Sequence, residues 1–528
     1  MQKRNHQTTL KKAEMKKIFF SLLLLTAFVA QQSCNKKLDE VNLSYQALSP
    51  ANIDINAGTW KPILLAAPDE FPVAVPVATA TPIYTAELNE IKSWQRNITD
   101  EQKQIIKYWS AGSVLRWNEI LRNLVAKHNI PPYQNQDGTY PFPSAANPFA
   151  YPVFPFSNPP YAARAYAYIS AAQYDALVAA YHYKKLYNRP APYKIDSSIT
   201  ALIPKSDLPS YPSEDGAIIG ATIELLKLLF PADLSYIEQK ADENRLYRII
   251  AGANVRSEIE AGEALGKAVA QKFTARARTD KAGAAIGTSV FWAQLETQAV
   301  AKGEMPWISL ESPKRPPMLP LFGKVKTFLF DSATLVSIRP PAPPSTKSDQ
   351  FKKEVDEVMY YSKHPTNERM KIVQFWADGV NTATPPGHWN AIAADAFVQS
   401  NFSEVRWARN FALLNMAMMD AAIACWDTKY LYFNPRPSQV NPEIKTLTGL
   451  PNFPSYTSGH STFSGAASTI LIYIMPSKAA VFSAMADEAS VSRLYGAIHY
   501  RSDIEQGLLC GQRVGAFAIS RAKIDGAD

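Results

Sequence analysis

Apolar residues along the chain recur mostly at spacings of three and four, which predicts helices. One such stripe follows Gly459 and stops at Pro476, and its members are Phe463, Ala467, Ile470, Leu471 and Ile474. Alanine-rich stretches at 161–183 and 405–426 have the same periodicity. Because alternating, strand-like runs are almost absent, the pattern predicts an all-α protein.

A long internal repeat relates the predicted helices to one another. The segment at 208–213, with the sequence LPSYPS, recurs at 453–458 as FPSYTS, 245 positions later. Applied without gaps to residues 163–262, this offset aligns about 31 identical residues in each hundred. We infer a tandem duplication of one helical unit, and we expect two helical bundles that each bury their own apolar stripe.

Composition is compatible with two bundles and excludes several other classes of protein. The chain has 528 residues, of which 47% are hydrophobic and 19% charged, which excludes a disordered or fibrous protein. The net charge is +8, but residues 1–33 hold six of the positive charges and a single acidic residue, so the remainder is too balanced to predict a nucleic-acid partner. Three cysteines form no disulfide scaffold. Cys425 and Cys510 lack metal-ligand spacing and are predicted to be buried free thiols.

The N-terminal residues have the features of an export signal. Basic residues ending at Lys16 and Lys17 precede an apolar stretch at 18–30, which is too short to span a bilayer. The next residues, Gln-Gln-Ser-Cys, end at Cys34 and are similar to a bacterial lipoprotein cleavage box, in which the cysteine becomes lipidated. We predict an exported cell-envelope lipoprotein, periplasmic or attached to the outer membrane, whose only membrane contact is a lipid anchor at Cys34. Ordinary secretion is the alternative.

These patterns divide the chain into five segments. We predict a signal peptide at 1–33, an N-terminal extension at 34–95, a degenerate first helical bundle at 96–275, a connection at 276–347 and a catalytic helical bundle at 348–528. The connection is rich in proline and is expected to run over the surface. Neither the role of the extension nor the oligomeric state is indicated.

The two copies of the repeat differ in their candidate catalytic residues. His460 and His499 of the second copy correspond to Asp215 and Asn254 of the first, and Gly459 corresponds to Glu214. Packing alone does not require this difference. A catalytic site is therefore expected in the C-terminal half only.

Two segments of that half predict a binding site for an anion. Lys429 and Arg436 lie seven residues apart where a helix is expected to end, so both cations can face one pocket. Ser458 precedes the helix with the apolar stripe and is a natural N-cap. The backbone N–H groups of the first turn, beginning with Gly459, would then face an anion with the helix dipole behind them.

A third segment adds an oriented imidazole. His499 and Asp503 are four residues apart on one helix face, so the carboxylate can accept one ring N–H and orient the other nitrogen. Together with Arg493, the cations and the helix N-terminus suit a tetrahedral oxyanion with two or three negative charges. One histidine can act as nucleophile or metal ligand, and the other, His460, as acid or base. Taken singly, each of these residues also has an ordinary structural explanation, such as a helix cap or a solvated cation.

The three segments resemble the ordered motifs of the vanadium-dependent haloperoxidase and type 2 phosphatidic acid phosphatase superfamily. Motif order and internal spacings agree, and Thr457 departs from the family, which usually has proline there. The resemblance implies paired helical bundles of that superfamily, with the active site in the C-terminal bundle. It covers the second copy well and the first as a degenerate counterpart.

The resemblance also implies roles for individual residues. His499 would bind vanadium, while Lys429, Arg436, Ser458, Gly459 N–H and Arg493 would hold the vanadate oxygens. His460 would be the acid–base group that assists hydrogen peroxide. The cofactor would be vanadate, and the partners would be hydrogen peroxide, halide and a small organic acceptor. In the phosphatase branch no cofactor is needed, and the substrate is a phosphate ester.

Other residues of the pocket bear on the choice between branches. Trp426 and Phe453 resemble the aromatic lining of chloroperoxidase-like members, whereas bromoperoxidases typically have histidine at the second position. Asp378, in a stretch that also resembles haloperoxidases, is expected to pair with Arg493, and His388 to line the entrance. Both aromatic residues could equally be plain core residues.

Three hypotheses for the function follow. The first is a vanadate-dependent haloperoxidase that oxidises halide with hydrogen peroxide to hypohalous acid. The second is a soluble acid phosphatase of the same superfamily that forms a phosphohistidine at the same site. The third is a surface lipoprotein that binds ligands without catalysis. The intact histidines argue against the third, because a binding protein has no need for a base oriented by a carboxylate.

Overall fold

The computed structural model describes residues 45–129, 158–312 and 314–527. The predicted export signal and Cys34 lie outside these residues. Helices and loops make up the described residues, among which there is no β-strand, so the predicted all-α class is confirmed. No helix in this part of the chain combines the length and apolarity needed to cross a membrane.

The offset found in the sequence also relates the helices. The first set is α5 (Pro159–Tyr187), α6 (Pro192–Ile195), α7 (Glu214–Leu229), α8 (Leu234–Ile250) and α9 (Arg256–Thr279). The second set is α15 (Glu404–Tyr432), α16 (Pro437–Val440), α17 (Gly459–Ile474), α18 (Ala479–Tyr495) and α19 (Arg501–Ala522). Corresponding helices begin 245 positions apart, as α5 does at 159 and α15 at 404. The predicted boundary at residue 275 falls inside α9.

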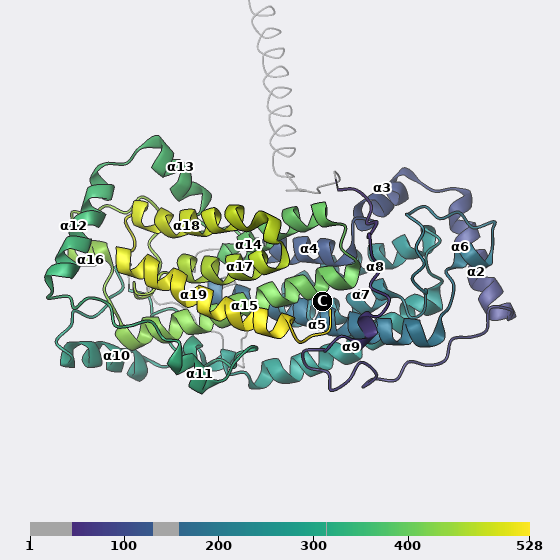
Figure 1. The fold of residues 1–528 in the computed structure, drawn as a ribbon, viewed down its shortest axis with the longest axis horizontal. Helices are drawn as coiled ribbons and strands as arrows, with labels where there is room; N and C mark the ends of the chain where they lie inside the picture. Colours follow the sequence, from purple (N-terminus) through teal and green to yellow (C-terminus); the bar gives the residue numbers. More distant parts are fainter. Residues whose placement is uncertain (1–44, 130–157, 313, 528) are drawn as a thin grey trace, which may run out of the picture. The chain divides into compact units, whose positions relative to one another are not determined.

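Helices α5 and α15 pack against each other in the centre of the described structure (Figure 1). Each has 29 residues, and most of them are buried, because small and apolar residues occur on every side of both helices. Asn415 of α15 donates a hydrogen bond of 2.8 Å to the hydroxyl of Ser170 of α5, and these two positions correspond in the repeat. Contact between equivalent positions indicates a local two-fold relation between the halves.

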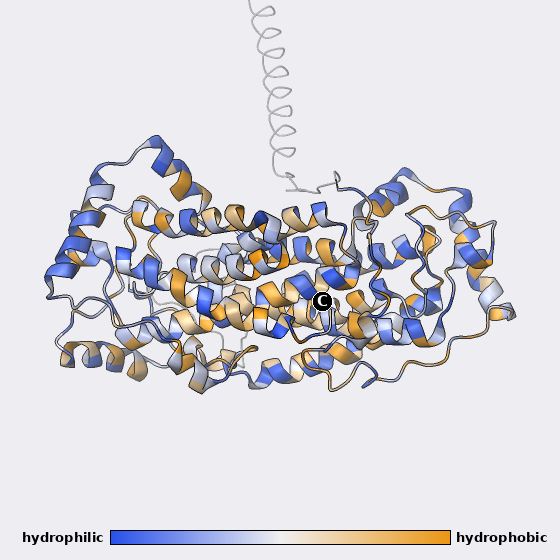
Figure 2. Ribbon diagram, viewed as in Figure 1, coloured by the Kyte–Doolittle hydropathy of each residue, from blue (hydrophilic) through white to orange (hydrophobic). Residues whose placement is uncertain are grey.

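The two halves share one hydrophobic core, in contrast to the separate cores expected from the sequence. A single cluster of buried side chains includes Ile169 and Leu177 of α5 together with Leu414 and Ile423 of α15. Figure 2 shows apolar residues gathered along the inner helices, whereas α3 and α12 are largely hydrophilic. The difference has a physical reason, since neither central helix could expose a face without leaving apolar surface in water.

The remaining helices precede the first set or lie between the two sets. Those before it are α2 (Pro82–Arg96), α3 (Asp100–Trp109) and α4 (Ser113–His128). Those between are α10 (Ser289–Ala301), α11 (Ser332–Ser337), α12 (Asp349–Lys363), α13 (Asn367–Phe375) and α14 (Thr384–Phe397). Single 3₁₀ turns are η1 (Ala57–Thr59), η2 (Pro231–Asp233), η3 (Ala282–Ala284), η4 (Phe322–Lys324), η5 (Val398–Ser400) and η6 (Pro476–Lys478).

Equivalent aspartates attach two extended segments to the central helices. Asp175 of α5 accepts hydrogen bonds from the backbone N–H groups at positions 63, 64 and 65, at 2.6, 2.7 and 3.1 Å. Asp420 of α15 accepts the backbone N–H groups of Phe328 and Leu329 at 2.9 and 2.8 Å. The first segment belongs to the N-terminal extension and the second to the connection. The connection therefore packs into the fold, with Leu319 and Phe322 buried.

Candidate active site

Lys429 lies in the last turn of α15 and is completely buried. Its ammonium group donates hydrogen bonds to the carbonyl oxygens of Pro454, Ser455 and Thr457 at 2.8, 3.0 and 2.5 Å. No carboxylate forms an ion pair with it among the described residues. Burial, with repulsion from Arg436, lowers the pKa of Lys429 to about 7. When protonated, the lysine is thus held by carbonyl dipoles rather than by a counter-charge, and an anion nearby would favour this charged form.

Arg436 is the N-cap residue of α16 and is also buried. Nε donates to the carbonyl of Phe453 at 2.9 Å, and Nη1 donates to the carbonyl of Ile498 at 2.8 Å. Nη1 also lies 3.1 Å from Nε2 of His499. Nη2 is buried and has no hydrogen-bond partner within the described chain. Burial lowers the pKa of this guanidinium to about 10, so it remains charged at neutral pH with one donor group unused.

Arg493 supplies a third buried cation near the end of α18. Nε donates to the hydroxyl of Ser492 at 2.9 Å, and Nη2 donates to the carbonyl of Trp376 at 2.5 Å. As with the other two cations, none of the described carboxylates forms an ion pair with it, and burial lowers its pKa to about 10. Three buried basic groups without a carboxylate partner are costly to bury, and a bound anion would stabilise them.

The N-terminus of α17 faces the same space. Ser458 is the predicted N-cap, and its hydroxyl accepts a hydrogen bond of 3.3 Å from the N–H of Ser461. A Cβ atom added at Gly459 would meet only Cζ3 of Trp426, at 3.9 Å, within a 4 Å radius. The first turn of the helix is therefore open in front, where a ligand can approach the backbone N–H groups.

His499 is a neutral imidazole of defined orientation. Nδ1 lies 2.8 Å from Oδ2 of Asp503, and Nε2 lies 3.1 Å from Arg436 Nη1. Because a guanidinium can only donate, Nε2 must be the acceptor nitrogen, and Nδ1 must carry the proton that is donated to Asp503. Burial and the charges of Arg436 and Lys429 lower the pKa of His499 well below its usual value. The lone pair of Nε2 thus points at the cluster of cations.

Asp503 is fixed by two further donors. The hydroxyl of Ser455 donates to Oδ2 at 2.5 Å, and the backbone N–H of Tyr500 donates to the same oxygen at 3.1 Å. Burial raises the pKa of Asp503 to about 6. Sequence reasoning missed Ser455, although it recurs in the repeat as Ser210 and could have been found from that recurrence.

His460 and Asp378 form a second acid–base pair, and both residues line the same cavity as His499. Nε2 of His460 lies 3.6 Å from Oδ2 of Asp378, and neither atom has a hydrogen-bond partner in the described structure. Burial, together with the charge of Arg493, lowers the pKa of His460 to about 4. Burial alone would raise the pKa of Asp378, but its contacts with His388 and His460 outweigh burial and hold that pKa below its usual value.

Two predictions about this pair differ from the structure. Asp378 was expected to pair with Arg493, yet its Oδ1 lies 3.0 Å from Nδ1 of His388, and Arg493 is held by carbonyls instead. His388 was expected to line the entrance, yet it is not among the residues that line the cavity; it contacts Asp378 and is stacked on Trp376 with ring centroids 4.5 Å apart. The left-handed backbone conformation of Asp378, with φ of 45°, directs its side chain in a way that spacing does not reveal.

A cavity of about 610 Å³ adjoins this cluster and is lined by Gly459, His460, Arg493 and His499. Lys429, Arg436 and Ser458 are buried and do not line it, although Nη1 of Arg436 lies 3.1 Å from Nε2 of His499. Trp426 and Phe453 also line it, as predicted, with ring centroids 5.1 Å apart. The Phe453 ring lies 4.8 Å from the Lys429 ammonium and 5.0 Å from the Arg436 guanidinium.

Part of the wall comes from segments that sequence reasoning did not connect with the site. Met318, Glu311 and Arg315 of the connection line the cavity, and the carbonyl of Met318 accepts a hydrogen bond from the indole of Trp426 at 3.1 Å. The two cysteines are buried free thiols, as predicted. No cluster of three or more metal-ligating His, Cys, Asp or Glu residues occurs in the described part of the chain.

Comparison with known proteins agrees with the motifs and the fold. Residues 410–523 match the family model of the PAP2 superfamily. The structure is similar to that of the first bacterial vanadium-dependent iodoperoxidase, with a TM-score of 0.57, 24% identity, and coverage of 77% of this chain and 96% of that one. A bacterial vanadium-dependent chloroperoxidase is more distant, with a TM-score of 0.48, 14% identity, and coverage of 70% of this chain and 92% of that one. No curated protein matches the chain.

The family match of residues 410–523 agrees with the superfamily that the three motifs indicate. The helical fold is that of vanadium haloperoxidases, and the C-terminal segment, which carries every candidate cation and both histidines, is a PAP2 superfamily domain.

Proposed function

We propose that the protein is an enzyme whose site binds a tetrahedral oxyanion, and that with vanadate it is a haloperoxidase that oxidises halide with hydrogen peroxide to hypohalous acid. The observation that carries this proposal is the meeting of Lys429, Arg436 and Arg493, buried without a counter-charge, around the lone pair of a neutral His499. A ligand with several negative charges would neutralise the three cations. The iodoperoxidase that shares the fold is consistent with vanadate as this ligand.

The residues present fit vanadate. Arg436 has a buried, unpaired Nη2, and the absent Cβ of Gly459 leaves room in front of the first turn of α17. Lys429, Arg436, Arg493 and the N–H of Gly459, with the hydroxyl of Ser458, would hold the oxygens. Nε2 of His499 would be the protein ligand to vanadium.

The chain's own residues would orient the reaction and move its proton. Bound vanadate supplies a Lewis-acid centre that activates hydrogen peroxide toward halide. Asp503 keeps Nδ1 of His499 protonated, so that Nε2 remains a donor of electrons throughout. With a pKa of about 4, His460 is neutral near pH 7 and can accept a proton from incoming hydrogen peroxide at Nε2. Asp378, 3.6 Å away, would stabilise the resulting imidazolium.

A soluble phosphatase is the second candidate, and the match of residues 410–523 to the PAP2 superfamily favours keeping it. The same cations would hold the phosphoryl group of a phosphate ester. Nε2 of His499 would attack phosphorus while the ester oxygen leaves with a proton from His460, and water would then hydrolyse the phosphohistidine. His460 must be protonated before it can donate this proton, whereas the haloperoxidase reaction would use its neutral form, which is the form present near pH 7. A binding lipoprotein without catalysis is the remaining alternative.

A test of the proposal uses metal-free protein, reconstituted with vanadate. Peroxide-dependent halogenation of an activated carbon acid is measured with iodide, bromide and chloride, and hydrolysis of an aryl phosphate is measured separately without vanadate. Vanadate binding is followed by equilibrium dialysis, which does not depend on turnover. We expect halogenation and binding in the wild type, and loss of halogenation in His499→Ala.

His364→Ala is the matched control, because His364 is exposed at the end of α12. It should bind vanadate and halogenate like the wild type. Phosphate hydrolysis that vanadate inhibits, without halogenation, would support the phosphatase. Vanadate binding with neither activity would leave a binding protein, and no vanadate binding at all would refute the proposed site.

We also propose that the protein is exported and anchored to the membrane by a lipid at Cys34.

A further inference from the structure

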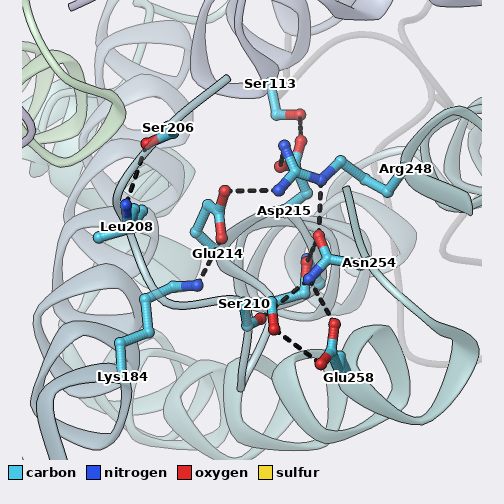
Figure 3. A network of polar contacts seen from close by, with 12 residues as sticks. Ser113, Lys184, Ser206, Leu208, Ser210, Glu214, Asp215, Arg248, Asn254 and Glu258 are labelled. Carbon is cyan, nitrogen blue, oxygen red and sulfur yellow. Dashed lines mark hydrogen bonds and ion pairs between the residues drawn. The ribbon is translucent and has the colours of Figure 1, made fainter. Parts of the chain in front are cut away.

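The first half contains a polar cluster at the positions that correspond to the candidate active site (Figure 3). Lys184 of α5 corresponds to Lys429, and Arg248 of α8 corresponds to Arg493. Between them lies the carboxylate of Glu214, the first residue of α7, where the second half has Gly459. Oε2 of Glu214 is 2.6 Å from Nζ of Lys184, and Oε1 is 2.7 Å from Nη2 of Arg248.

A pair of hydrogen bonds beside Glu214, both donated to Glu258, has an equivalent in the C-terminal half. The hydroxyl of Ser210 donates to Glu258 at 2.7 Å, and Nδ2 of Asn254 donates to the same carboxylate at 3.0 Å. Ser455 and His499 make the equivalent contacts with Asp503, as described above. Ser213 caps α7, accepting the N–H of Gly216 at 3.2 Å. The two halves thus present corresponding cations and a corresponding helix N-terminus toward one point.

What occupies that point differs between the halves. In the active half the space before Gly459 is open. In the first half the Glu214 carboxylate fills it, buried and held between two cations that also keep its pKa low in spite of burial, so it is ionised at neutral pH. The carboxylate oxygens take the contacts that the oxygens of an external anion would make with a lysine and an arginine.

We propose that the first half is an oxyanion site whose ligand is the protein's own Glu214 carboxylate, and that removing this side chain opens a second site for a tetrahedral oxyanion such as phosphate. A cavity of about 110 Å³ already adjoins Glu214 and is lined also by Ala191 and Arg248. Removal of the side chain would enlarge it between Lys184 and the first turn of α7. The proposal does not depend on what the C-terminal half catalyses.

The opened site should bind more weakly than the active half. Ala191 replaces the third cation, Arg436, and Asp215 lies 2.9 Å from Nη1 of Arg248 and partly neutralises it. Asn254 replaces the histidine, so the bound oxyanion would be held by charge alone and not by a covalent or metal–ligand bond. Inorganic phosphate at millimolar concentration is therefore the suitable probe.

The test compares Glu214→Gly with Glu214→Gln in the full chain. Both variants remove the charge, which leaves Lys184 without a carboxylate partner and Arg248 with Asp215 alone, so the Tm of each should fall by on the order of 5 °C. Only the glycine variant also opens space. Phosphate should therefore raise the Tm of Glu214→Gly by more than it raises the Tm of the wild type, while Glu214→Gln should respond like the wild type. Sodium chloride at equal ionic strength controls for screening.

Equal phosphate responses in all three proteins would overturn the proposal. If Glu214→Gly does not fold without an anion, its refolding yield is measured with phosphate and with chloride, and equal yields would again refute it. If the C-terminal site binds no oxyanion, the wild type will show no phosphate response while Glu214→Gly still does. Failure of the proposed function and failure of this inference are thereby distinguished.

Discussion

Gly459→Glu should give the C-terminal half the arrangement of the first half, in which a glutamate carboxylate lies between a lysine and an arginine. The added side chain starts where a Cβ meets only Trp426 Cζ3, at 3.9 Å, so the substitution needs no rearrangement of the backbone. Its carboxylate would then lie between Lys429 and Arg493, as Glu214 lies between Lys184 and Arg248 at 2.6 and 2.7 Å. We expect a folded protein that has lost its oxyanion site.

The size of the effect follows from these two contacts. A hydrogen bond to a charged group contributes about 1.5–3 kcal/mol, and ordering a glutamate side chain costs up to about 2 kcal/mol. Two such bonds leave a net gain of about 1–4 kcal/mol for the occupied state. An external oxyanion must displace this carboxylate, so its affinity should fall about 5-fold to about 1000-fold, at about 1.4 kcal/mol for each factor of ten. The Tm of the ligand-free protein should rise, because buried cations gain a partner.

Two measurements check this expectation. Isothermal titration with vanadate and with phosphate gives the affinity, and thermal unfolding without ligand gives the change in stability. Gly459→Ala is the control, since its methyl group makes only an ordinary contact with Trp426 and leaves the cations unpaired. Because it adds a methyl group in front of the helix N-terminus but no charge, it should lose much less affinity than Gly459→Glu.

Retained oxyanion affinity in Gly459→Glu would refute the correspondence between the halves. A lower Tm than that of Gly459→Ala would also do so, because it would mean that the carboxylate does not reach the two cations. Weaker binding together with higher stability is the combination that the geometry requires.

Two further predictions concern pH and halide choice. Because the pKa of Lys429 is lowered from 10.5 to about 7, the unfolded chain binds more protons between these values, and the stability of the ligand-free protein should rise with pH across that interval. Unfolding by denaturant at pH 7 and pH 10 should show this rise in the wild type and in the exposed control Lys302→Met, and a smaller one in Lys429→Met. Phe453→His should shift halide preference toward bromide in competition assays; an unchanged bromide-to-chloride ratio would mean that this ring does not tune halide choice.

The helices of the two halves could be predicted because their signals are local. Apolar periodicity, alanine content and the constant offset in the repeat sufficed for the all-α class, and Ser458 was recognisable as an N-cap from the stripe that follows it. The cations and histidines of the site could be found because each motif occupies a few consecutive residues at a helix end. Comparison of the copies then assigned the site to the C-terminal half.

Other features depend on packing that no local pattern encodes. The contact between Ser170 and Asn415 joins the halves through helices with small and apolar residues on every side, so periodicity could not reveal which faces meet. The partners of Asp378 follow from its left-handed backbone conformation. Met318 reaches the cavity from an irregular segment, where neither spacing nor periodicity predicts direction.

The attachment of the connection through Asp420 has a consequence for how this fold can diversify. The carboxylate accepts hydrogen bonds from the main-chain N–H groups of Phe328 and Leu329, and every residue except proline has such a group. The amino acids at those two positions can therefore change without releasing the connection from α15. The nearby residues Glu311, Arg315 and Met318, which line the cavity, can then change as well and alter the shape of its wall, while the buried cations of the C-terminal half stay in place.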